Sequence, residues 1–89
     1  MSLPFVENNL GDNTFIRVFD SNTDIGEFHW HRDREDRIIE PLEPTDWKIQ
    51  LENQLPQSID SKIYIPMGLW HRVIRGSGDL KIKLIKIPA

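Results

Sequence analysis

The sequence predicts an all-β fold, a small sandwich or barrel formed by one domain. Three observations support this prediction: β-like segments recur at near-even spacing, turn-forming residues separate them, and no segment sustains a helical period. With 89 residues the chain forms a single core with room for about one small cavity.

Seven segments have strand character, because they are rich in β-branched and aromatic residues or alternate between apolar and polar positions. They are Thr14–Phe19, Glu27–His31, Arg37–Glu40, Trp47–Glu52, Lys62–Ile65, His71–Arg75 and Leu80–Ile87. In the last of these, Leu80, Ile82 and Leu84 alternate with polar residues. This pattern is typical of a strand with one core face and one solvated face.

Turn-forming residues punctuate the chain between these segments. They are Gly11-Asp12-Asn13, Asp20-Ser21-Asn22, Pro41, Pro44, Pro56, Asp60-Ser61, Pro66 and Gly76-Ser77-Gly78-Asp79. One helical turn is conceivable within 33–40, but Pro41 and Pro44 prevent it from growing.

The composition excludes several classes of protein. The absence of cysteine excludes disulfide scaffolds and thiol nucleophiles. The net charge of −3 disfavours binding to nucleic acids, which is usually accompanied by a basic excess. The first residues lack the basic and apolar regions of a secretory signal, and no apolar run is long enough to cross a membrane. We therefore expect a cytoplasmic protein without membrane or nucleic-acid partners.

The three histidines fall in two short segments. His29 and His31 are two residues apart, so they project from the same face of an extended strand. An acidic residue, Glu35, follows them, and His71 begins a strand after a turn that contains Gly68. Imidazole and carboxylate groups together are typical ligands of divalent transition metals. The pattern predicts a metal site, provided that the turn brings His71 back to the first pair.

The first histidine segment resembles the first motif of the cupin superfamily, G-x5-H-x-H-x3-4-E-x6-G. His29, His31 and Glu35 match the centre of that motif. The flanking glycines do not match, since Gly26 is too close to His29 and position 42 is leucine.

The second segment resembles the second cupin motif, G-x5-P-x-G-x2-H-x3-N. Pro66, Gly68 and His71 match its centre. Asp60 replaces the first glycine of this motif, and Arg75 replaces the final asparagine.

The resemblance spans 26–87 and implies that residues 1–89 form one double-stranded β-helix, or jelly-roll, barrel. The chain is short for the family, which implies that one or two peripheral strands are missing. The resemblance also implies one divalent metal, such as Fe, Mn, Ni or Zn. Its implied ligands are His29, His31, Glu35 and His71, with Asp36 as the reserve for Glu35.

A second assignment of the ligands stays open. The related iron/2-oxoglutarate oxygenases bind iron through His-x-Asp and a distal histidine, which His31, Asp33 and His71 resemble. Those enzymes also carry an arginine some residues past the distal histidine, and Lys81 takes that place in this chain.

Around the predicted site, Arg75 is a candidate clamp for a carboxylate or phosphate, because a guanidinium binds such groups with two hydrogen bonds. Trp70 and Tyr64 are the further candidates for contact with a ligand at the rim. Trp30 lies between the paired histidines and is expected to face outward. There it would form a homodimer contact or pack under the strand that holds Phe15.

A fold does not determine an activity. The expected function is that of a small metal-binding protein, such as an enzyme of the dioxygenase or isomerase type, acting on a small anionic molecule. The alternatives are a non-catalytic binding or structural module and an accessory subunit of a larger assembly.

Overall fold

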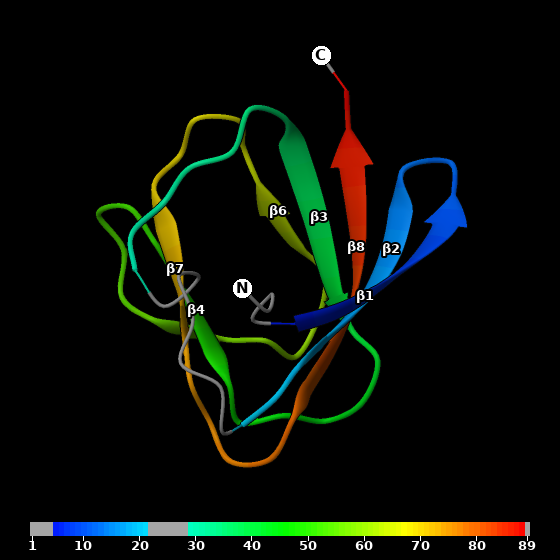
Figure 1. The fold of residues 1–89 in the computed structure, drawn as a ribbon. Coiled ribbons are helices and arrows are strands. Elements are labelled where there is room, and N and C mark those ends of the chain that lie inside the picture. Colours follow the sequence, from blue (N-terminus) through cyan, green and yellow to red (C-terminus); the bar gives the residue numbers. More distant parts are fainter. Residues whose placement is uncertain (1–4, 22–28, 89) are drawn as a thin grey trace.

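The computed structural model describes residues 5–21 and 29–88, and the regular secondary structure within these ranges is entirely β-strand. These residues contain no helix capable of spanning a membrane. The strands are β1 (Phe5–Gly11), β2 (Thr14–Phe19), β3 (Asp36–Pro41), β4 (Lys48–Leu51), β5 (Gln57–Ser58), β6 (Ile63–Ile65), β7 (His71–Ile74) and β8 (Leu80–Ile87). They form two antiparallel sheets, with the strand orders β1-β2-β8-β3-β6 and β5-β4-β7 (Figure 1). The predicted all-β fold is confirmed.

Six of the seven predicted strands are present. β2 and β8 have the predicted bounds, and β3, β4, β6 and β7 differ from prediction by single residues at their ends. The seventh segment behaves differently: positions 27 and 28 lie outside the described residues, and His31 forms an isolated bridge with His71 instead of a strand.

The first strand, β1, is not predicted from the sequence, because its middle is a run of polar residues. It forms a hairpin with β2 in which Gly11 pairs with Thr14. Asp12 and Asn13 form the two-residue turn, with φ angles of 52° and 60°. A tight hairpin of this kind requires positive φ at both positions, and Asn and Asp tolerate that conformation better than most residues.

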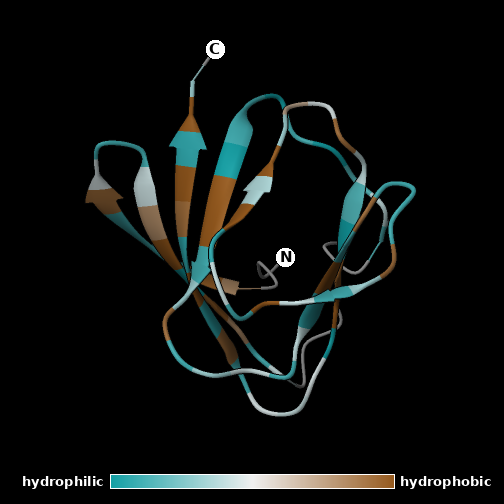
Figure 2. Cartoon of the chain, turned by 180° about the vertical axis from the view of Figure 1, so that it is seen from behind, coloured by the Kyte–Doolittle hydropathy of each residue, from teal (hydrophilic) through white to brown (hydrophobic). Residues whose placement is uncertain are grey.

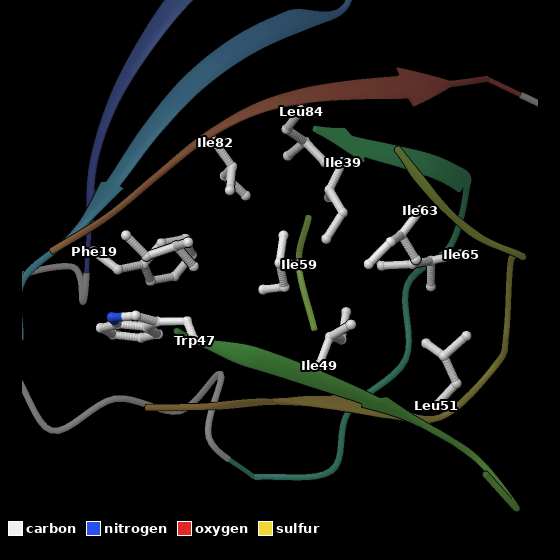
Figure 3. Packing of buried hydrophobic residues seen from close by; sticks show 11 residues of the cluster. Phe19, Ile39, Trp47, Ile49, Leu51, Ile59, Ile63, Ile65, Ile82 and Leu84 are labelled. Atoms are coloured by element: carbon white, nitrogen blue, oxygen red, sulfur yellow. The ribbon is translucent and has the colours of Figure 1, made fainter. Parts of the chain in front are cut away.

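The hydrophobic core lies between the two sheets, whose inner side chains point toward one another (Figure 3). Its buried members are Phe19, Ile39, Trp47, Ile49, Leu51, Ile59, Ile63, Ile65, Leu80, Ile82 and Leu84. Trp47 is fully buried, and its indole Nε1 donates a hydrogen bond of 3.0 Å to the carbonyl oxygen of Gly78. This bond satisfies the polar atom of the buried indole ring.

Strand β8 is central in the larger sheet, since it pairs with β2 on one side and β3 on the other. Leu80, Ile82 and Leu84 are buried while Lys81 is exposed, so the predicted alternation of faces is confirmed. Figure 2 shows brown hydrophobic bands between teal hydrophilic ones along the strands, with the loops mainly teal or white.

The core makes a direct prediction about stability. Leu84 is 1% exposed and Leu55 is 86% exposed. Leu84→Ala leaves a cavity among packed side chains and should lower the free energy of unfolding by about 2–5 kcal/mol. Leu55→Ala removes the same atoms from a solvated position and should change it by less than about 0.5 kcal/mol. Urea denaturation of both variants checks this, and equal losses would contradict the assignment of the core.

Candidate metal centre

His31 and His71 lie opposite each other in an isolated antiparallel bridge. His31 N donates to His71 O at 3.0 Å, and His71 N donates to His31 O at 2.8 Å. Paired residues in such a bridge project to the same side, so the two rings meet. Their centroids are 4.2 Å apart with an angle of 60° between the planes. The backbone pairing therefore places two imidazoles at one point.

Both histidine rings are oriented in the same way. Nδ1 of His31 lies 2.9 Å from the carbonyl oxygen of His29, and Nδ1 of His71 lies 2.9 Å from that of Leu69. A carbonyl oxygen can only accept, so each Nδ1 carries a hydrogen, and in the neutral ring each Nε2 carries the lone pair. Rings held in this way through Nδ1 are set up to bind a metal through Nε2.

Asp33 completes the group. One ligand atom each from His31, Asp33 and His71 lie within 4.8 Å of one another. The position of Asp33 is fixed by its backbone, since its carbonyl oxygen accepts a hydrogen bond of 2.9 Å from Gly68 N. Gly68 has a φ of 78°, a conformation that strongly favours glycine, so the turn before His71 depends on this residue.

The Asp33 carboxylate has a feature that points to a bound cation. Its Oδ2 atom lies 3.2 Å from His71 Nε2 and 3.3 Å from Arg37 Nε. Yet Oδ2 and Arg37 Nε are both buried without hydrogen-bond geometry to any described residue. A buried carboxylate oxygen this close to an imidazole nitrogen is costly unless a proton on that nitrogen or a metal ion lies between them. The residues present therefore fit a divalent metal.

Asp33 is ionised under ordinary conditions. Burial by itself raises the pKa of Asp33. Contact with His71 and the charge of the Arg37 guanidinium lower this pKa by a larger amount. The net result is a pKa below the ordinary value of 3.8. The group is thus available as a carboxylate ligand at neutral pH.

The structure brings together two of the four ligands that the cupin motifs imply, His31 and His71. His29 is exposed, and Glu35 Oε1 lies 3.2 Å from Arg37 Nη2; neither belongs to the group of converging ligand atoms. The reserve candidate, Asp36, accepts a hydrogen bond from the backbone of Met67 at 2.7 Å. Metal binding by His29 and Glu35 stays a prediction, whereas the described geometry matches the alternative triad with Asp33.

The same two residue types flank both His31 and His71, a pattern that the sequence-based prediction of the site did not use. Each is preceded by tryptophan and followed by arginine. In the antiparallel bridge, Arg72 Cζ lies 5.1 Å from the Trp30 ring centroid, and Arg32 Cζ lies 5.1 Å from that of Trp70. These reciprocal cation–π contacts reinforce a bridge that has only two backbone hydrogen bonds.

The group lies between two hollows. On the outer side, Asp33 lines an open groove of about 440 Å³ together with Arg32, Arg34, Met67 and Gly68. On the inner side, His71 and Arg37 line a cavity of about 40 Å³ between the sheets. Arg17 also lines this cavity, and its other walls are apolar. A ligand can therefore reach the site from a groove that is open to solvent.

The remaining predicted residues lie around this centre. Arg75 follows the end of β7 and is exposed; it does not line the inner cavity, although Val73 does. Tyr64 is 48% exposed on β6, and a hydrogen bond to Asp36 raises its pKa. Trp30 is 43% exposed, as expected for an outward residue, and the Arg72 guanidinium lies over its ring. The roles of Arg75, Tyr64 and Trp70 in ligand binding stay predictions, as does the homodimer.

Comparison with known proteins places this arrangement in a known fold. No protein-family profile matches the sequence, and no curated protein matches it. Among solved structures, a cupin domain from Bordetella pertussis Tohama I aligns with 100% of this chain over 99% of its own length, at 19% identity and a TM-score of 0.67. An RmlC-like cupin with a double-stranded β-helix fold from Methanocaldococcus jannaschii covers 98% with 83% of its own, at 15% identity and a TM-score of 0.71.

The chain has the cupin fold. A third structure of the same fold, Co(II) HppE in complex with Tris buffer, covers 98% of this chain with 55% of its own, at 14% identity and a TM-score of 0.62. At such identities the likeness establishes the cupin fold and leaves the chemistry to the residues of this chain.

The ring orientations can be tested directly. In metal-free protein above the pH at which imidazoles titrate, proton–nitrogen correlation spectra should show His31 and His71 with hydrogen on Nδ1, because each Nδ1 donates to a carbonyl oxygen. The exposed ring of His29 is the internal reference. If either His31 or His71 carries its hydrogen on Nε2, the ring is not positioned as a ligand.

Proposed function

We propose that this protein binds one divalent transition metal through His31, Asp33 and His71 and uses it to act on a small anionic molecule. The observation that carries the proposal is the buried Asp33 Oδ2 atom, which faces His71 Nε2 without a hydrogen-bond partner among the described residues. Two histidines and one carboxylate form the triad typical of non-haem iron sites, which leaves coordination positions open. The Co(II) in HppE is a divalent metal bound by a protein of the same fold.

The charges around the site support an anionic ligand. Asp33 and Glu35 both pair with the single guanidinium of Arg37, so the three groups carry a net charge of −1. A divalent cation changes this balance to +1. Because the site is partly buried, a monovalent anion would stabilise the remaining charge more than a neutral molecule would.

Each residue of the site has a definable role in this proposal. The carbonyl oxygens of His29 and Leu69 hold the rings through Nδ1, and Arg37 restrains the Asp33 carboxylate. The groove beside Asp33 opens the site to solvent, and the inner cavity presents Arg17 and Arg37 beside His71. When bound, the metal supplies Lewis-acid or oxygen-binding chemistry at its open positions.

The ligand set is tested by comparing five variants. His31→Ala, Asp33→Ala and His71→Ala should each weaken metal binding by more than about 100-fold, since changes in outer-shell residues alone cost 10–100-fold. His29→Ala and Glu35→Ala are the matched controls, because the described geometry leaves both residues outside the group. Binding of Fe(II), Co(II) and Zn(II) is measured by calorimetry and by metal analysis, with circular dichroism to verify folding.

Two outcomes would be decisive against the triad. If the wild-type protein binds none of these metals, the proposed function is wrong. If His29→Ala and Glu35→Ala lose the metal as completely as the other three variants do, the four-ligand set implied by the cupin motifs is correct.

The same site predicts a pH dependence. Asp33 takes up a proton only below its lowered pKa, so it remains a carboxylate while the pH falls from 7 to about 5. Imidazoles ordinarily take up protons in this interval and then cannot bind a metal. Metal binding should therefore be strong at pH 7 and lost toward pH 5, as followed by the absorption spectrum of the Co(II) form. Release only below pH 4 would mean that the histidines are not ligands.

One observation favours a second candidate, a non-catalytic binding module. Among the described residues that line the groove, Asp33 is the only one able to act as a general base, and the proposed metal already uses it. Oxygen uptake and turnover by the iron-loaded protein with small carboxylates separate these two candidates. Metal and anion binding without any turnover would favour the module.

A further inference from the structure

Arg17 is a buried charge that the proposed metal site does not use. It belongs to β2, and its side chain is 9% exposed. Its Nε atom lies 2.5 Å from Glu7 Oε2, and its Cζ lies 4.2 Å from the ring centroid of Phe5. Both partners come from the neighbouring strand β1, so the guanidinium is held firmly from one side.

The other side of the Arg17 guanidinium faces the interior. Arg17 lines the cavity between the sheets, which it shares with His71 and Arg37. Its Nε donates the hydrogen bond to Glu7, and the two terminal nitrogens have no hydrogen-bond partner among the described residues. These nitrogens are not among the fully buried unpaired atoms of the described residues, so a small molecule can reach them. The two together form a fork that matches a carboxylate. The fork therefore presents a binding site for an anion.

The cavity sets the size and character of that anion. Its volume of about 40 Å³ corresponds to about three water-sized positions. Apart from Arg17, Arg37 and His71, the lining residues are all apolar. Arg37 is already occupied by Asp33 and Glu35, so Arg17 is the cation available to a ligand. These limits fit a carboxylate with a very short apolar body.

We propose that this cavity binds a small monocarboxylate of the size of acetate through the terminal nitrogens of Arg17. The ligand then lies in the cavity that His71 helps to line, on the inner side of the metal centre. Its assignment as the molecule on which the metal acts rests on the proposed function, whereas its binding to Arg17 does not. This assignment also differs from the prediction that Arg75 is the anion clamp, since Arg75 does not line the cavity.

The test is a titration of the metal-free and the zinc-loaded protein with acetate, followed by nuclear magnetic resonance of the arginine side chains. Acetamide is the neutral probe of the same shape, and hexanoate is the probe that is too long. Wild type is compared with Arg17→Gln and with Arg75→Gln, which removes the same charge outside the cavity. Glu7→Gln is the variant with the opposite expected effect on acetate binding, because it removes the carboxylate that competes for Arg17.

The expected result is that acetate shifts the Arg17 signals, while acetamide and hexanoate do not. Arg17→Gln should weaken acetate binding at least tenfold, Arg75→Gln should leave it unchanged, and Glu7→Gln should strengthen it. If Arg17→Gln does not fold, Glu7→Gln and the Arg17 signals of the wild type still decide. Failure of acetate to bind wild type, or binding that depends on Arg75 instead, would overturn the proposal.

The two proposals fail in different ways. Acetate binding through Arg17 in a protein that takes up no metal would leave this inference standing and remove the proposed function. Metal binding by His31, Asp33 and His71 without acetate binding at Arg17 would leave the proposed metal site standing and remove this inference.

Discussion

The antiparallel bridge between His31 and His71 is the constraint on which the candidate site depends. It ties the segment before β3 to the start of β7 through two backbone hydrogen bonds, and the bond from Gly68 to Asp33 extends the same pairing. All three converging side chains therefore come from one local crossing of the chain. The ligands are positioned by backbone geometry, and the outer tryptophan–arginine contacts add rigidity to a pairing too short to be a sheet.

The second constraint on the structure is the pairing of charged side chains inside a small core. Arg17 and Arg37 both lie on the inner side of the larger sheet, where an unpaired cation would be destabilising. Each is partly neutralised by carboxylates, Glu7 in one case and Asp33 with Glu35 in the other. In neither case is the pairing complete, since Arg17 has two unused nitrogens and the Nε of Arg37 lacks hydrogen-bond geometry. Both arginines therefore keep donors without an acceptor among the described residues, and both line the same cavity.

Much of the fold could be predicted because strand alternation is a local property. β2 and β8 follow directly from it, whereas β1 is hidden by its polar middle and depends on pairing with β2. The site shows the same contrast. From His31 to Glu35 the odd positions are partly buried and Arg32 and Arg34 are exposed, so alternation alone places Asp33 beside His31. The family motif favoured Glu35, but the Glu35 carboxylate pairs with Arg37, two residues further along the same extended segment.

The packing of the core explains why the site has two hollows of such different size. Eleven buried apolar residues of the described part of the chain pack between and beside the sheets, and the cavity that most of them line together with Arg17, Arg37 and His71 measures about 40 Å³. A larger enclosed pocket would require more strands or the loss of core side chains that stabilise the fold. Any larger ligand must therefore be accommodated in the open groove beside Asp33, where solvent competes for its polar contacts. Because the interior can exclude water only around a very small ligand, selectivity in this protein is expected to come from size and charge at Arg17.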